Sequence, residues 1–360
     1  MSTAAAFGDE RLAGLRPGAQ ESLLRVEQLV KEFPLGRGGL RGRGGQVIRA
    51  VDGTSFDVSR GETFGLVGET GCGKSTLGRC ILRLLEPDSG RVFYDGVDLL
   101  ALDREEMRHM RRRLQIVFQD PYSSLDPRMS VAGIVEEGLR IHGLGDRADQ
   151  RTRALEMLSI VGLNAEQAGR KPHAFSGGQR QRISLARALV LDPELVVLDE
   201  PISSLDVSIQ AQVMNLLRSM QERFSLTYVF IVHDLAVAEY FCDRVAVLYL
   251  GGIQELADRE TIFREPLHPY TVSLLSAVPI PDPTRERRRQ RIVLRGEVSP
   301  ADVLSGCPFR PRCPVGRERE VCLAVRPPLR ELNPGHWVSC HFPGELRASG
   351  VRAELGARAR

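Results

Sequence analysis

The sequence predicts an α/β fold around a central parallel sheet, and three features carry that prediction. Short apolar runs typical of strands alternate with segments of helical periodicity. A glycine-rich GxxxxGKS string at residues 68–75 lies between one such run and a helical segment. From residue 130 to residue 192 the strand-like runs stop and helical periodicity dominates, which predicts a helical subdomain inserted between two strands.

The strands are expected where apolar residues form short or alternating runs. Residues 22–33 and 47–58 alternate on either side of a Gly- and Arg-rich insertion at 34–46. The later runs are residues 62–67, 91–94, 114–118, 195–198, 227–232 and 244–248. Helices are expected over residues 76–85 and 176–191, where apolar residues recur at helical spacing.

The composition is that of an ordinary globular protein, with 42% hydrophobic and 26% charged residues and a net charge of +3 over 360 residues. This balance gives no reason to expect a nucleic-acid partner. No run approaches the ~18 apolar residues of a membrane-spanning helix, and the amino terminus lacks a secretory signal pattern. The sequence therefore predicts a soluble chain that is not exported. Its cysteines are expected in a reducing compartment, where thiol chemistry or metal binding is favoured over disulfides.

The string at residues 68–75 has the features of a phosphate-binding loop. Its three glycines let the backbone curl so that successive N–H groups point at a phosphate. Lys74 supplies a mobile positive charge for the β- and γ-phosphates, and Ser75 supplies a hydroxyl for Mg²⁺. The residues expected to contact ATP are Gly68, Glu69, Thr70, Gly71, Cys72, Gly73, Lys74, Ser75 and Thr76. The alternative is a glycine-rich turn that binds nothing.

Two carboxylates, Asp199 and Glu200, end the apolar run that begins at residue 195. This is the carboxyl end of a strand, where α/β sheets place their ligands. Asp199 is expected to hold Mg²⁺ through its waters, and Glu200 is expected to act as the general base that polarises the attacking water. A surface Asp-Glu pair is the alternative, and the phosphate loop upstream argues against it.

A second glycine-containing string, Phe-Ser-Gly-Gly-Gln at residues 175–179, offers another anion site. Ser176 caps a predicted helix, and Gly177 and Gly178 expose the N–H groups of its first turn. Ser176 and Gln179 also form a capping box, so a purely structural role is the alternative. Because the phosphate loop already has its own lysine and metal ligands, this spare site is expected to serve a partner's nucleotide.

The order of these strings resembles that in the nucleotide-binding subunit of ABC transporters, over residues 22 to about 260. The ordered set is the phosphate loop, Gln119, Ser176 with its glycines, Asp199-Glu200, Asp206 and His233. The resemblance implies a P-loop NTPase cassette that clamps two ATP molecules head to tail in a dimer. It implies that Gln119 senses Mg²⁺ and the water, that His233 contacts the γ-phosphate, and that Asp206 lies in the loop crossing the dimer interface. Phe33 is the candidate for stacking on adenine, with core packing as the alternative.

Further strings resemble the oligopeptide and dipeptide importers of that family and extend the resemblance to about residue 343. They are residues 118–128, Phe175, and residues 206–212, 268–270 and 306–313. The resemblance implies a subunit that hydrolyses ATP to drive uptake of peptides or related solutes. It also implies a second ATPase subunit as heterodimer partner, two membrane permease subunits, an extracytoplasmic solute-binding protein, and a place at the cytoplasmic face of the membrane. The insertion after Phe33 and the Gly-Cys-Gly-Lys loop resemble the second ATPase subunit of such pairs.

The chain is then expected to divide into five parts. These are a flexible amino terminus (1–21), an ABC ATPase domain (22–260) with its helical subdomain (about 130–192), a C-terminal region (261–345) and a flexible tail (346–360). Other functions stay open. A soluble cassette ATPase acting on DNA or ribosomes would need tandem cassettes or long heptad arms. Relatives of these importers also carry nickel complexes or oligosaccharides.

Four cysteines lie in the Pro-rich C-terminal region, which has too little apolar periodicity to build a core of its own. They are Cys307, Cys313, Cys322 and Cys340. Four thiolates can hold a tetrahedral zinc ion or a [4Fe–4S] cluster, and their spacing does not discriminate between the two. Unliganded packing thiols are the third alternative. The matching cysteines of the peptide importers imply a [4Fe–4S] cluster.

Overall fold

The computed structural model describes residues 22–34, 47–278, 291–292, 294 and 305–346. The segments expected to be flexible, residues 1–21 and the tail from residue 347, lie outside these described residues. The same holds for most of the insertion after Phe33. None of the helices in the described part of the chain is long and apolar enough to cross a membrane.

The central sheet contains five parallel strands in the order β9-β3-β8-β7-β6, which confirms the predicted parallel core. Three of them, β3, β7 and β8, are buried along their whole length, as parallel strands covered on both faces must be. Their bounds are β3 Thr63–Val67, β6 Leu114–Val117, β7 Leu195–Asp199, β8 Thr227–Val232 and β9 Arg244–Tyr249. Antiparallel strands β10 (Gly252–Asp258), β12 (His336–Val338) and β11 (Arg330–Asn333) extend the sheet at the β9 edge.

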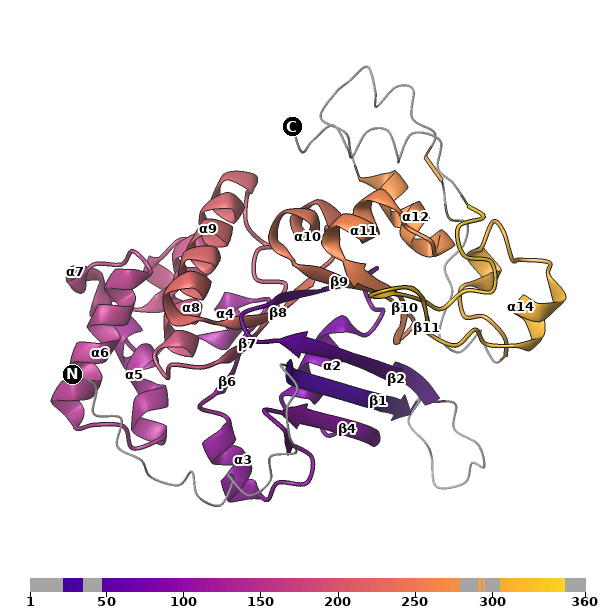
Figure 1. The fold of residues 1–360 in the computed structure, drawn as a ribbon. Helices are drawn as coiled ribbons and strands as arrows, with labels where there is room; N and C mark the ends of the chain where they lie inside the picture. Colours follow the sequence, from indigo (N-terminus) through magenta and orange to yellow (C-terminus); the bar gives the residue numbers. More distant parts are fainter. Residues whose placement is uncertain (1–21, 35–46, 279–290, 293, 295–304, 347–360) are drawn as a thin grey trace.

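A second, antiparallel sheet lies over the first helix after the phosphate loop (Figure 1). Its order is β2-β1-β4-β5. The bounds are β1 Ser22–Pro34, β2 Val47–Ser59, β4 Ser89–Tyr94 and β5 Val97–Asp98. The expected strands in residues 22–33, 47–58 and 91–94 are therefore real, but they do not join the parallel sheet. They pair with one another because β1 and β2 form a hairpin, and their inward side chains pack with Leu77 and Ile81 of α2 (Lys74–Ile81).

Helices fill the chain between β6 and β7, at the left of Figure 1. They are α4 Pro121–Ser124, α5 Val131–Ile141, α6 Arg147–Ile160, α7 Ala165–Ala168, η1 Pro172–Ala174 and α8 Gly177–Leu189. Side chains of Ser130, Asp146 and Asn164 cap α5, α6 and α7 by accepting backbone N–H groups of the first turn. The remaining helices are α3 Arg104–Met110, α9 Val207–Phe224, α10 Leu235–Phe241, α11 Arg259–Arg264, α12 Pro269–Ala277, η3 Arg310–Arg312 and α14 Glu320–Ala324.

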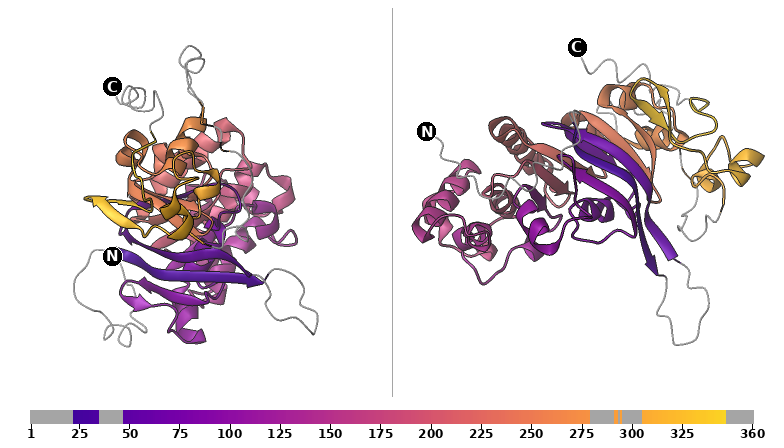
Figure 2. Two further views of the ribbon diagram at one scale, coloured as in Figure 1. Left: turned by 90° about the vertical axis from the view of Figure 1, so that its right-hand side faces the viewer. Right: turned by 60° about the horizontal axis from the view of Figure 1, so that its bottom comes forward.

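The described part of the C-terminal region, residues 261–278 and 305–346, lies at the end of the molecule opposite those helices (Figures 1 and 2). It joins the central sheet through β12, in which Trp337 pairs with Leu256 of β10. A buried polar contact supports this junction, because the fully buried carboxylate of Glu255 lies 2.7 Å from Nε2 of His336. The same carboxylate accepts the N–H groups of Leu267 and His268. The region is thus anchored to the ATPase core by both backbone pairing and hydrogen bonds to the Glu255 carboxylate.

Candidate nucleotide site

The phosphate loop connects β3 to α2, as the strand, loop and helix pattern predicts. Its curl depends on glycine at two positions. Gly68 has φ +152°, and a Cβ there would lie 2.3 Å from the carbonyl oxygen of Leu248. Gly73 has φ +103°, and a Cβ there would lie 1.9 Å from the carbonyl oxygen of Ala50. Any larger residue would strain the loop and push it off the neighbouring backbone.

Lys74 and Ser75 point their polar groups into the site from the first turn of α2. Lys74 is 4% exposed, and its Nζ donates to the carbonyl oxygens of Gly68 at 2.7 Å and Glu69 at 3.0 Å. The Ser75 hydroxyl donates to Oδ1 of Asp199 at 2.6 Å. Burial raises the pKa of the Asp199 carboxyl, which is 1% exposed. A hydroxyl in contact with a buried carboxylate is an oxygen set that suits Mg²⁺.

Glu200 follows β7 with a left-handed backbone, φ +47°, and its N–H donates to the carbonyl oxygen of Ile231 at 3.1 Å. Its Oε2 accepts from Nε2 of Gln119 at 2.8 Å. Nδ1 of His233 lies 3.5 Å from the same oxygen. Three elements that are distant in sequence therefore bring one carboxylate, one amide and one imidazole together beside the phosphate loop.

These groups line one open pocket of about 620 Å³. Its lining residues are Ala50, Thr70, Gly71, Gly73, Lys74, Ser75, Thr76, Gln119, Asp120, Glu200, Ser203, Ser204 and His233. Asp120 belongs to the string at residues 118–128, and Ser204 directly precedes Leu205-Asp206, but neither was assigned a role from the sequence. No role was predicted for Ala50 or Ser203. The pocket is large enough and polar enough for the phosphates of a nucleotide.

Four predicted contacts of the nucleotide do not line this pocket: Gly68, Phe33, Cys72 and Glu69. Phe33, at the end of β1, is 38% exposed and carries the ammonium of Lys31 over its ring at 5.6 Å. Cys72 is 5% exposed, and burial raises the pKa of its thiol. Its side chain packs in the core, so only its backbone is available to a phosphate. Glu69 is turned the other way, towards the C-terminal region.

The Ser176 string lies at the amino terminus of α8, outside the pocket. Ser176 Oγ accepts from the N–H of Gln179 at 3.3 Å, and the Gln179 side chain accepts from the N–H of Ser176 at 3.0 Å, so the expected capping box is present. Gly178 packs closely on Ile209, because a Cβ there would lie 2.4 Å from Cγ2 of that residue. Asp206, which is exposed, caps α9 by accepting the N–H of the same Ile209 at 3.0 Å. The string and Asp206 are therefore joined through Ile209, and neither lines the pocket of the chain's own phosphate loop.

The four C-terminal cysteines line a second, small pocket with Phe309, Gly316 and Phe342. All four are buried. Burial raises the pKa of Cys307 to about 11 and that of Cys340 to about 12. Backbone N–H groups of Gly316 and Phe342 donate to the sulfurs of Cys313 and Cys340 at 3.2 and 3.3 Å. Within the described residues, however, no group of three or more His, Cys, Asp or Glu side chains is arranged to hold a metal ion.

Known proteins resemble the chain along most of its length. The family model described as ABC transporter matches residues 51–203, and the one described as oligopeptide/dipeptide transporter, C-terminal region, matches residues 254–322. The oligopeptide transport ATP-binding protein AppF of Bacillus subtilis is 48% identical, over 90% of this chain and 98% of AppF. A protein of Brucella ovis, named as a candidate peptide import ATP-binding protein, is 53% identical over 81% of this chain and 92% of its own length.

Solved structures agree with this assignment. The dimeric ATP-binding cassette MJ0796 in a post-hydrolysis state, bound to ADP and Pi, aligns with a TM-score of 0.58 and 29% identity. The alignment covers 66% of this chain and 98% of that cassette. The predicted α/β cassette fold is confirmed. With its phosphate loop, its paired carboxylates and relatives of about 50% identity, the chain belongs to the ATP-binding proteins of ABC transporters, in the oligopeptide/dipeptide transporter family.

Proposed function

We propose that this chain is the ATP-hydrolysing subunit of an importer for peptides or related solutes, and that it works as one half of a two-cassette dimer. The observation that supports the dimer is that the two candidate anion sites of the chain do not share a pocket. The phosphate loop, Gln119, Glu200 and His233 line one pocket, whereas the Ser176 string, which contacts the start of α9 beside Asp206, does not line it. An anion site at a helix amino terminus that does not line the chain's own phosphate pocket is suited to the nucleotide of a second cassette.

In the proposed mechanism the phosphate loop holds the β- and γ-phosphates through its backbone N–H groups and Lys74. Ser75 and Asp199 would hold Mg²⁺, which neutralises charge on the phosphates when it is bound. Glu200 takes a proton from the attacking water, while Gln119 and His233 fix the position of its carboxylate. Phe33 remains the candidate for adenine stacking, since its exposed ring stands outside the phosphate pocket.

The proposed partners are a second ATPase subunit, two membrane permease subunits and, indirectly, an extracytoplasmic solute-binding protein. Attachment to the cytoplasmic face of the membrane would then occur through the permeases. The strings shared with oligopeptide and dipeptide importers favour peptides over nickel complexes or oligosaccharides as the solute. A role on DNA or ribosomes is disfavoured, because the chain has one cassette and no long heptad arms.

Hydrolysis is expected to depend on assembly. The purified chain should hydrolyse ATP slowly, and the rate per subunit should rise when the partner ATPase and permeases are added, because each site needs a Ser176 string from the facing cassette. Phosphate release measured at fixed chain concentration, with oligomeric state followed by light scattering, tests this. A chain that stays monomeric at assay concentration and matches the rate of the complex would contradict the shared-site proposal.

We further propose that the four-cysteine pocket takes a [4Fe–4S] cluster, with zinc and unliganded thiols as the alternatives. The donor set fits, since four buried thiols face one pocket and two of them already accept backbone N–H groups. Hydrogen bonds to sulfur are a common feature of cluster sites. The thiols must move closer together to bind an ion, because no such group within the described residues is arranged for it.

Anaerobic purification is expected to give brown protein with iron approaching about four atoms per chain, as a [4Fe–4S] cluster requires. Cys322→Ala should remove the iron, because it removes one ligand. Cys80→Ala is the matched control, since Cys80 is an equally buried thiol in a different core. Colourless anaerobic protein that carries one zinc ion per chain would contradict the [4Fe–4S] assignment. The proposal of a four-cysteine metal site would still hold. Metal-free protein would favour packing thiols.

A further inference from the structure

The C-terminal region reaches the phosphate loop at Glu69. Nη1 and Nη2 of Arg312 lie 2.6 and 3.0 Å from the two carboxylate oxygens of Glu69, across 243 positions of sequence. The Arg312 side chain is 12% exposed and that of Glu69 is 38% exposed. A paired, two-point contact of this kind fixes orientation as well as distance, and partial burial protects it from screening by salt.

A second residue of the C-terminal region holds the same loop position. The hydroxyl of Tyr270 accepts the backbone N–H of Glu69 at 3.0 Å, and Tyr270 itself is fully buried in α12. The carbonyl oxygen of Glu69 accepts Nζ of Lys74. Glu69 is thus held at three points. Two of the partners come from the C-terminal region and the third is the lysine of the phosphate loop.

Arg312 and Tyr270 both contact one cluster of aromatic rings, formed by Tyr249, Tyr270 and Phe309. Phe309, which is fully buried, packs its ring 5.3 Å from the rings of both Tyr249 and Tyr270. The guanidinium of Arg312 lies over the Tyr249 ring at 6.0 Å. Because Phe309 and Arg312 both belong to the segment between Cys307 and Cys313, a change in that segment moves the groups that hold Glu69.

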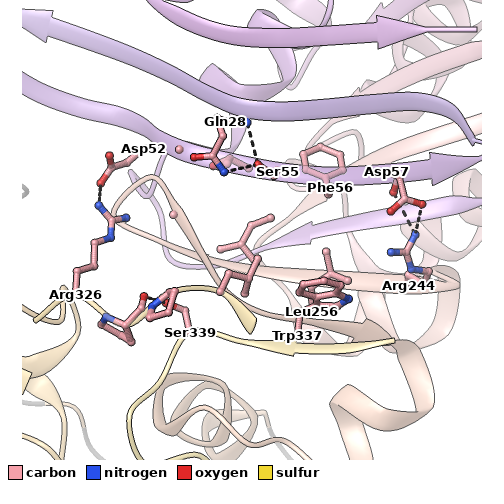
Figure 3. A pocket seen from close by; sticks show the side chains of 17 residues that line it. Gln28, Asp52, Ser55, Phe56, Asp57, Arg244, Leu256, Arg326, Trp337 and Ser339 are labelled. Atoms are coloured by element: carbon pink, nitrogen blue, oxygen red, sulfur yellow. Dashed lines mark hydrogen bonds and ion pairs between the residues drawn. The ribbon is translucent and has the colours of Figure 1, made fainter. Parts of the chain in front are cut away.

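A second contact joins the C-terminal region to β2, which is linked to the phosphate loop through Gly251 (Figure 3). Arg326 pairs with Asp52 of β2 at the edge of a groove of about 720 Å³. The N–H of Asp52 donates to the carbonyl oxygen of Gly251, and the N–H of Gly251 donates to the carbonyl oxygen of Cys72. Trp337, the one tryptophan of the sequence, lines this groove and reports on it by fluorescence.

We propose that Arg312 and Tyr270 are positioning residues for ATP binding, so that the C-terminal region sets the nucleotide affinity of the phosphate loop. The proposal rests on the nucleotide site described above. When Lys74 turns from the loop carbonyls to the phosphates of ATP, Glu69 loses one of its three partners. The two from the C-terminal region then keep the start of the loop in place. Arg312 also neutralises a carboxylate that would otherwise repel the anionic nucleotide.

Binding of Mg²⁺ and the fluorescent analogue mant-AMPPNP to the full chain tests this. Arg312→Gln is expected to raise the Kd roughly tenfold, in line with the loss of a charged, two-point contact. The double variant E69Q/R312Q should recover much of the affinity, because no unpaired carboxylate is left. Tyr270→Phe should give a smaller rise. In the assembled transporter, Arg312→Gln should raise the KM for ATP and leave kcat nearly unchanged.

Arg319→Gln is the matched control. Arg319 also makes a two-point pair, with Glu345 at 3.1 and 2.7 Å, within the same region and away from the phosphate loop, and this pair is more exposed than the one between Arg312 and Glu69. Trp337 fluorescence without nucleotide shows whether each variant keeps its C-terminal region docked. If Arg312→Gln does not fold, Arg312→Lys and Glu69→Gln probe the same pair from either side.

Equal rises in Kd for Arg312→Gln and Arg319→Gln would overturn the proposal, since both would then reflect general loosening. An unchanged Kd in Arg312→Gln with intact Trp337 fluorescence would overturn it as well. Wild-type protein that binds no mant-AMPPNP would instead count against the proposed ATPase function, so the two failures are distinguishable.

Discussion

Replacing Glu200 with Gln is expected to stop ATP turnover while leaving ATP binding intact. The carboxylate stands at the carboxyl end of β7, accepts from Gln119 at 2.8 Å and lies 3.5 Å from Nδ1 of His233. Glutamine keeps the size and the hydrogen-bonding length of the side chain but cannot take a proton from water. Loss of a general base typically lowers a rate by about 10²- to 10⁴-fold. The ATP-bound dimer should accumulate as a consequence.

Phosphate release by the assembled transporter and nucleotide binding by the same sample measure the two effects. Glu86→Gln serves as the control, because Glu86 is an exposed glutamate paired only with Arg83 in the structure's described contacts. If the Glu200→Gln complex hydrolysed ATP near the wild-type rate, Glu200 would not be the general base. Loss of nucleotide binding would point to a structural role for Glu200.

Gly177→Asp is expected to abolish hydrolysis at the partner's nucleotide without weakening binding at the chain's own phosphate loop. A Cβ at Gly177 meets only Leu205 at 3.4 Å, which is ordinary contact, so the fold should tolerate the change. The new carboxylate would stand at the amino terminus of α8, where the proposed site receives the γ-phosphate of the facing cassette. The backbone N–H of residue 177 stays in place, so the expected loss comes from repulsion between the new carboxylate and the γ-phosphate.

Gly169→Asp is the control for added charge, since nothing lies within 4 Å of a Cβ at Gly169 and its backbone, at φ −80°, suits any residue. Hydrolysis by the assembled complex and mant-AMPPNP binding by the isolated chain are measured for both variants. If Gly177→Asp weakens binding by the isolated chain, the Ser176 string acts within its own subunit. If the complex with Gly177→Asp hydrolyses ATP as fast as the complex with Gly169→Asp, the Ser176 string serves no nucleotide.

Features set by local sequence could be predicted well. The apolar run before the phosphate loop became β3, and the GxxxxGKS spacing brought Lys74 and Ser75 to the first turn of α2. The carboxylates after residue 198 reached the loop because parallel strands end at one edge of a sheet. The capping box formed by Ser176 and Gln179 could also be predicted, because it depends only on residues 176–179.

Features set by contacts between distant segments could not be predicted. Alternation in residues 22–33 predicts a strand, but it does not say which sheet the strand joins. Only the hairpin with β2 and the packing on α2 decide that. The string at residues 306–313 includes Arg312, but it gives no sign that this arginine pairs with a carboxylate 243 positions away. The orientation of Phe33 is equally undetermined, since a ring at the end of a strand can face a ligand or solvent.

The left-handed backbone of Glu200 has a consequence for the thermal behaviour of the protein. A residue with a Cβ pays roughly 1–2 kcal/mol to adopt φ near +47°, and glycine does not. The hydrogen bond from its N–H to Ile231 and the packed end of β7 hold it there. We therefore expect glycine at this corner to recover part of that free energy of unfolding, less the entropy that glycine loses on folding, and the carboxylate proposed as the general base stands on a strained backbone.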